Sequence, residues 1–312
     1  MNAHKNLQKG MNLTQTNLVY HIFFNLTRAK ADFSLTLFTS CIFPCICYNN
    51  KKSTDGDFMH KYFPTLTERP ELNNSIAALV YQVVAYFSLP FLLLLLLQGG
   101  DVGRDKVEAA VEIAYHVFNF FVALFIFREY LTDASLSLKQ DLKRNMTTIW
   151  VSVGLIFLVS LVLYNLFAHS FSQLRLSAHG ALPLTEVELF VLPRDVVLTY
   201  PLFGTLCMMF LTPFSIGCLY YGAVFAPVCY TRPILAYFAM ALFLAFPRYC
   251  NGSTFWVPAE QIILYITQLP LHIIACRAYQ KSDSIWVPIA IHVIVNSFAC
   301  ALILLFSMLG RI

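Results

Sequence analysis

Long stretches without a charged residue are the feature that most limits the fold of this chain. A helix needs roughly 20 apolar residues to cross the hydrocarbon core of a bilayer. The composition agrees with a membrane location, because 58% of the 312 residues are hydrophobic and only 12% are charged. That charged share is about half of what an ordinary soluble domain carries. The charge-free stretches are residues 72–100, 145–174, 196–231, 261–276 and 284–310.

Two further stretches are weaker candidates for membrane spans. Residues 109–131 contain Glu112 and His116, and residues 233–247 are short and lie between two prolines. Only helices and closed barrels satisfy every backbone polar group in lipid, and the sequence lacks the period of two that a barrel requires. We therefore predict an all-α, polytopic membrane helix bundle of seven or eight transmembrane helices. Seven are expected near residues 76–98, 109–131, 148–169, 197–223, 232–248, 258–277 and 284–309.

The predicted eighth span depends on the N-terminal segment, residues 1–72, which precedes a transmembrane domain at 73–312. Its stretch "ADFSLTLFTSCIFPCICY" is apolar but short, and Pro44 interrupts it. It is compatible with an extra span, an interfacial piece or a partly disordered segment. A true start at Met59 is a further alternative, because the residues after it form an ordinary polar lead into the first span.

The distribution of lysine and arginine predicts the orientation. Basic residues are more frequent before the first span and around the 132–147 loop than on the other side. By the positive-inside rule, we expect the N-terminal segment and this loop in the cytoplasm and the chain in the cell membrane. The net charge of +4 is spread over the chain and forms no basic stripe, which argues against a nucleic-acid partner.

Two polar residues interrupt the last apolar stretch, in "SDSIWVPIAIHVIVN". His292 and Asn296 are four residues apart and therefore share one helix face, which we expect to point into the bundle. Ionisable groups inside a membrane are often functional. The simpler interpretation is a pair of interhelical hydrogen bonds, each contributing about 0.6 kcal/mol on average.

Three blocks of the sequence, in order, resemble the motifs of one family. "SDSIWVPIAIHVIVN" is similar to the last motif of the CPBP family, the CAAX proteases and bacteriocin-processing enzymes, also called the Abi family. "FLTPFSIGCLYYG" resembles its first motif, roughly "APxxEExxFRG", and "ALFLAFPRY" resembles its second, "LFGLAH". The resemblance covers residues 183–308. It implies the core of a polytopic intramembrane protease, preceded by variable helices.

The resemblance implies that His292 and Asn296 are remnants of the catalytic set, because both match the last motif. The other motif positions have mostly lost their polar chemistry while still being expected to line the same cavity. The two glutamates fall on Ile216 and Gly217, the arginine on Tyr221 and the second histidine on Pro247, whereas the phenylalanine of the second motif matches Phe243.

The missing residues bear on activity. Peptide hydrolysis requires a water molecule activated by a base or a metal ion, and a catalytic metal site requires about three protein ligands. We therefore predict a pseudoenzyme that uses no cofactor and no metal and that binds a peptide or membrane-protein partner. By family analogy, its context would be peptide processing, export or bacteriocin immunity.

An active intramembrane endopeptidase is the alternative. Glu108, Glu112 and His116 are spaced four apart in "EAAVEIAYH" and could meet His292 to rebuild a zinc site, with His272 as a further contributor. The competing interpretation places the glutamates near the interface and pairs His116 with a neighbouring helix. A small transporter is a third possibility, disfavoured because no paired Gly- or Pro-broken helices occur in repeated halves.

Overall fold

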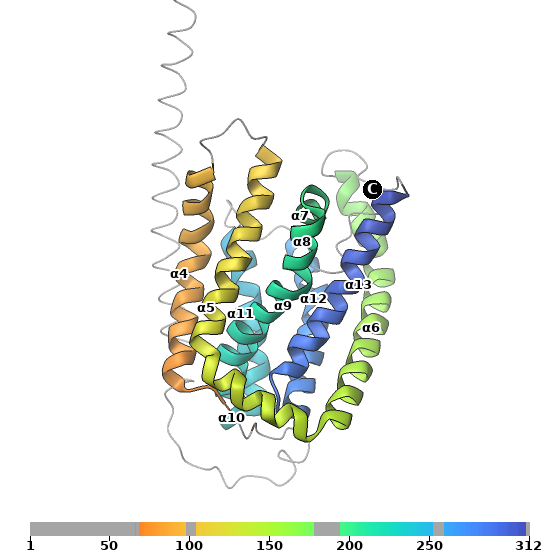
Figure 1. The fold of residues 1–312 in the computed structure, drawn as a ribbon. Helices are drawn as coiled ribbons and strands as arrows, with labels where there is room; N and C mark the ends of the chain where they lie inside the picture. Colours follow the sequence, from red (N-terminus) through yellow and green to blue (C-terminus); the bar gives the residue numbers. More distant parts are fainter. Residues whose placement is uncertain (1–65, 67–68, 98–103, 178–193, 252–258, 310–312) are drawn as a thin grey trace, which may run out of the picture. The chain divides into compact units, whose positions relative to one another are not determined.

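The computed structural model describes residues 66, 69–97, 104–177, 194–251 and 259–309, which belong to one compact unit, Lys51–Ile312. These residues form helices and, within the described ranges, no strand (Figure 1). The prediction of an all-α fold is confirmed for this part of the chain. The predicted N-terminal segment lies outside the described residues except for Leu66 and residues 69–72.

Three long helices come first in the described chain: α4 (Leu72–Leu97), α5 (Arg104–Gln140) and α6 (Leu142–Ser177). Asp141 alone separates α5 from α6. Both helices are longer than the apolar stretches from which they were predicted. Backbone hydrogen bonding continues through the polar residues at their ends, since apolar composition sets where lipid begins but does not end a helix.

The next part of the chain is a long helix, Pro201–Thr231, that changes its winding along its length. Five-residue π-helical turns alternate in it with ordinary α-helical turns, and a short helix precedes it. In chain order the segments are α7 (Arg194–Thr199), α8 (Pro201–Leu206), η3 (Cys207–Leu211), α9 (Thr212–Ile216), η4 (Gly217–Phe225) and α10 (Ala226–Thr231).

Three helices complete the described fold: α11 (Pro233–Asn251), α12 (Ala259–Ser282) and α13 (Trp286–Met308). Arg232 separates α10 from α11, where its extended backbone, with φ −140° and ψ 83°, ends the long helix. Pro233 follows it and begins α11, a position at which its fixed φ favours a helix and its missing N–H has no consequence.

Four of the described helices are long and apolar enough to cross a membrane, which indicates a membrane protein. They are Lys106–Leu136, Leu142–Leu163, Pro201–Thr231 and Trp286–Met308. The apolar helices Leu72–Ala85 and Pro233–Leu244 are shorter. The prediction of several helices long and apolar enough to span a membrane is confirmed, whereas the number of seven or eight stays a prediction.

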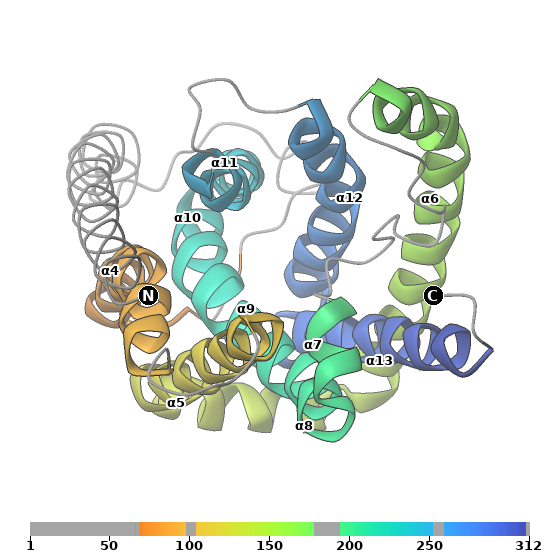
Figure 2. The same ribbon diagram turned by 90° about the horizontal axis from the view of Figure 1, so that it is seen from above.

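The long helix Pro201–Thr231 is the most enclosed of these spans. Half of its apolar window is buried, against 22% for Lys106–Leu136. Its η4 segment contacts α4, α5, α11 and α13, so helices from both earlier and later parts of the chain surround it (Figure 2). The candidate site lies where side chains of this helix meet side chains of α12 and α13.

Candidate functional site

A tyrosine on the long central helix joins two histidines from two other helices. The hydroxyl of Tyr221 in η4 lies 2.7 Å from Nε2 of His292 in α13 and 3.0 Å from Nδ1 of His272 in α12. The centroids of the two imidazole rings are 5.2 Å apart. All three side chains are buried, with exposed fractions of 0% for Tyr221, 2% for His292 and 8% for His272. We call these residues the Tyr–His cluster.

The hydroxyl of Tyr221 can satisfy both rings at once. It has one proton, which it donates to an unprotonated ring nitrogen, and lone pairs that accept a proton from the N–H of the other ring. A buried polar group without a partner costs about 1–3 kcal/mol. The cluster therefore gives one nitrogen of each imidazole ring a hydrogen-bond partner in an apolar interior.

Asn296 lies one turn beyond His292 and has a different partner. Its side-chain amide donates a hydrogen bond to the backbone carbonyl of Met208, over 2.9 Å. The backbone of the long helix leaves that carbonyl available, because the N–H of Thr212 donates to Cys207 in a five-residue turn. The next residue, Pro213, has no N–H to donate. Asn296 thus supplies a donor where the helix backbone lacks one.

Gly217 marks the closest approach between the central helix and α13. A Cβ atom at this position would lie 2.2 Å from Cγ1 of Ile289, which sits one turn before His292. Real Cβ atoms do not approach so closely, so the space above Gly217 is filled by the isoleucine. The preceding residue, Ile216, is half-buried at the end of α9.

The remaining motif positions lie on α11. Phe243 is buried and packs edge-on against Tyr220 of η4, with ring centroids 5.2 Å apart. It therefore ties α11 to the helix that carries Tyr221. The side chain of Pro247, near the end of α11, lies outside the described residues.

Glu112 and His116 form a separate polar pair on α5. His116 Nε2 and Glu112 Oε1 are 3.1 Å apart, and the glutamate side chain is 44% exposed. Further along α5, the side chain of Asn119 accepts a hydrogen bond from Tyr81 of α4, over 2.8 Å. Among the described residues, no three His, Cys, Asp or Glu side chains form a group that could hold a metal ion. The structure thus pairs Glu112 with His116 rather than grouping them with His292.

The motif resemblance predicted that Tyr221 lines the same cavity as His292, and His272 was considered as a further contributor to a metal site with His292. The hydrogen bonds from one tyrosine hydroxyl to both rings were not predicted. The available signal was that three polar side chains interrupt three apolar helices, since buried polar groups require partners. This signal does not say which of the helices pack against one another.

Comparison with known proteins finds no relative: no family model, no curated protein and no solved structure matches this chain. The resemblance to the CPBP motifs consequently rests on the residues of the three blocks themselves.

Proposed function

We propose that this chain is a multipass membrane protein on a CPBP-like scaffold that acts by binding a peptide or membrane-protein partner, without the family's peptidase chemistry. The observation that carries the proposal is the double hydrogen bond of the Tyr221 hydroxyl to His272 and His292. A histidine that binds a metal or activates water must present a free nitrogen lone pair. In the Tyr–His cluster the tyrosine hydroxyl engages the lone pair of one ring, and the nitrogen of the other ring that contacts the hydroxyl carries a proton instead of a lone pair.

The packing at Gly217 supports the same proposal. The resemblance puts a catalytic glutamate at this position, yet Ile289 occupies the space that any side chain there would need. A carboxylate at 217 would require α13 to move away from the central helix. The helix pair is therefore adapted to close packing, and Asn296 has a structural partner in Met208.

A strip of exposed aromatic side chains lies on α5. Phe118, Phe121 and Phe125 recur at helical spacing and are 53%, 62% and 84% exposed. Exposed apolar side chains on a transmembrane helix contact lipid or another helix, and aromatic rings offer large contact areas to either. We propose this strip as the contact surface for a partner helix, in a context of peptide processing or export that the CPBP resemblance suggests.

The proposed orientation places the ends of α5 and α12 in the cytoplasm, together with the beginnings of α6 and α13. Supporting this, that end carries more basic residues than the opposite end, which among the described residues has Arg104, Lys106, Arg175, Arg194 and Arg248. The basic residues at the proposed cytoplasmic end include Arg69, Lys139, Lys143, Arg144, Arg232, Arg277 and Lys281.

An active intramembrane endopeptidase is the second candidate, and the Tyr–His cluster also favours it. Two imidazoles joined by a phenol can pass a proton from one ring to the other, and acid–base catalysis needs side chains that give protons to, and take them from, the reacting group. His292 would then act as the base and Tyr221 as the proton carrier. The carboxylate of Glu112 would have to leave His116 to contribute.

A cleavage assay separates the two candidates. The purified protein, with and without added zinc, is incubated with prenylated and leader peptides, beside the His292→Ala and Glu112→Ala variants. We expect no turnover from any of them. Turnover by the wild type that either substitution abolishes would establish the endopeptidase and refute the binding proposal.

The binding proposal has its own test in native membranes. A photo-crosslinking amino acid at position 125 should give a discrete protein adduct, because Phe125 is the most exposed residue of the strip. The matched control is the same probe at Leu161 on α6, which is 58% exposed. Adducts of equal yield and pattern at both positions would contradict a specific partner surface on α5.

A further inference from the structure

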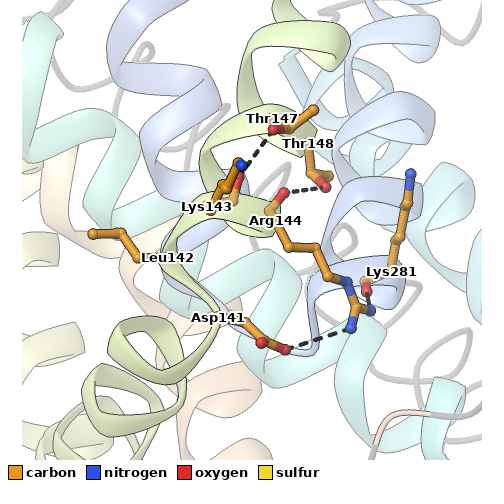
Figure 3. A pocket seen from close by; sticks show the side chains of 7 residues that line it. All are labelled: Asp141, Leu142, Lys143, Arg144, Thr147, Thr148 and Lys281. Carbon is orange, nitrogen blue, oxygen red and sulfur yellow. Dashed lines mark hydrogen bonds and ion pairs between the residues drawn. The ribbon is translucent and has the colours of Figure 1, made fainter.

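A polar cleft lies where α6 begins and α12 ends, away from the Tyr–His cluster. Its volume is about 480 Å³. Three cationic side chains face one carboxylate among its lining residues, so its formal charge is positive. The lining residues are Asp141, Leu142, Lys143, Arg144, Thr147, Thr148 and Lys281 (Figure 3).

Arg144 connects the two helices that form this cleft. One guanidinium nitrogen donates to the backbone carbonyl of Lys281, and the other lies 3.5 Å from the Asp141 carboxylate (Figure 3). These contacts use two of its five N–H groups, so the remaining donors can reach an anion. In the described part of the chain, no carboxylate forms an ion pair with Lys143 or Lys281.

The two threonines of the cleft have hydroxyl groups that already donate hydrogen bonds within α6. Thr147 donates its hydroxyl proton to the carbonyl of Lys143, and Thr148 donates to that of Arg144, both over 2.9 Å. Their donors are therefore used within α6. The charges in the cleft, together with the first turn of the 36-residue helix α6, whose dipole attracts negative charge, favour an anionic ligand.

The cleft lies at the membrane boundary. The candidate membrane span of α6 begins at Leu142, one of the residues that line the cleft. Thr147 is followed on the same helix face by Val151, Gly154 and Leu158, at spacings of three and four residues. Val151 and Leu158 are 65% and 59% exposed, and a side chain at Gly154 would meet no atom within 4 Å. A smooth apolar path thus continues from the cations into the lipid.

We propose that this cleft binds the phosphate headgroup of an anionic phospholipid, with an acyl chain along Val151, Gly154 and Leu158. Lys143 and Lys281 contact the phosphate oxygens, joined by the remaining donors of Arg144. The apolar path favours a lipid over free phosphate, because a soluble anion would gain nothing from it. This site goes beyond the proposed function and does not depend on whether the Tyr–His cluster is catalytic.

Trp150 provides a reporter for the test, because it lies on α6 beside the apolar path and is 58% exposed. The full chain is reconstituted in vesicles that contain phosphatidylglycerol or phosphatidylcholine with brominated acyl chains, which quench nearby tryptophan. The Trp150→Phe variant gives the background from the other tryptophans. We expect brominated phosphatidylglycerol to quench Trp150 more strongly than the phosphatidylcholine at equal mole fraction.

The variant Lys143→Gln/Lys281→Gln removes two cations from the cleft. We expect the preference for the anionic lipid to fall by about fivefold for each lysine, on the scale of about 1 kcal/mol per basic residue near an anionic surface. The matched control, Arg128→Gln/Lys139→Gln, removes two exposed charges from α5 and should leave the preference within about twofold. Lys143→Arg/Lys281→Arg keeps the charge and should retain it, which guards against misfolding.

Three results would overturn the proposal. The first is an absence of preference for phosphatidylglycerol in the wild type. The second is an equal loss in the cleft variant and in the control, which would mean diffuse attraction to the membrane surface. The third is displacement of the lipid by millimolar inorganic phosphate at constant ionic strength, which would identify a site for the free anion.

Discussion

Ile289 of α13 occupies the space directly over Gly217 of the central helix, so that a Cβ atom at 217 would lie 2.2 Å from its Cγ1 atom. The two helices can approach this closely because glycine has no side chain, as is common where membrane helices pack. The contact therefore sets the distance between α13 and the central helix at a point one turn before His292. Any residue larger than glycine must therefore displace the Ile289 side chain or the helix α13, which carries His292 of the Tyr–His cluster.

Gly217→Ala should destabilise the protein by about 1–3 kcal/mol, the usual range for overpacking a filled interior. The free energy of unfolding would be measured by SDS titration in mixed micelles. Gly154→Ala is the matched control, because its Cβ meets open space, and it should be neutral or slightly stabilising. In an Ile289→Ala background the cost of Gly217→Ala should shrink, and an unchanged cost would refute the contact.

The hydrogen bond from Asn296 to Met208 should depend on Pro213. Asn296→Ala removes the donor to a carbonyl that lacks a backbone partner, and we expect a loss of about 1 kcal/mol in unfolding free energy. Pro213→Ala restores a backbone N–H next to that carbonyl, so Asn296→Ala should cost less in this background. The double-mutant cycle measures this coupling. Equal costs in both backgrounds would show that Asn296 has another role.

Tyr221→Phe should leave both histidines of the cluster without the hydroxyl. Because two buried ring nitrogens lose a partner, we expect a destabilisation of about 1–2 kcal/mol by SDS titration. Tyr230→Phe is the control on the same helix, since Tyr230 is exposed and its contact is the Arg69 guanidinium over its ring, 4.2 Å away, which phenylalanine retains. Equal stability of Tyr221→Phe and wild type would contradict the hydrogen-bonded cluster.

The stability of the protein should depend on the pairing of Glu112 with His116 on α5. His116→Ala leaves the carboxylate in a membrane span without its partner, which should lower stability by about 1 kcal/mol or more. Adding Glu112→Gln should recover most of that loss, because the amide carries no charge. Thermal unfolding in detergent would compare the single and double variants. A double variant less stable than His116→Ala would count against this pairing.

The sequence predicted well those features that depend on composition and local spacing. Charge-free stretches located the apolar helices, since lipid excludes charges regardless of tertiary structure. The spacing of His292 and Asn296 predicted one buried face, and both residues are buried. These predictions succeed because each depends only on the residues of a single helix and on the lipid around it.

The partners of those residues could not be predicted, because they depend on the relative rotation of helices. A π-helical turn adds a residue to the winding and shifts the faces of the central helix, so a constant period of 3.6 does not predict which of its side chains face the same neighbouring helix. Apolar stretches also carry no signal for where helices end, as the extension of α5 to Gln140 shows. A proline at position 213 removes one backbone donor from the helix. That this leaves the carbonyl of Met208 to accept a hydrogen bond from Asn296 is known only from the structure.

The central position of the Pro201–Thr231 helix has a consequence for biosynthesis. Its η4 segment contacts α4 and α5, which are synthesised before it, and α11 and α13, which are synthesised after it. The acceptor at Met208 and the hydroxyl of Tyr221 therefore enter the membrane before Asn296 and the two histidines exist. During that interval the helix depends on water, lipid headgroups or an insertion chaperone for its polar groups. A ribosome that stalls before α13 should consequently leave a chain that membrane quality control recognises and degrades.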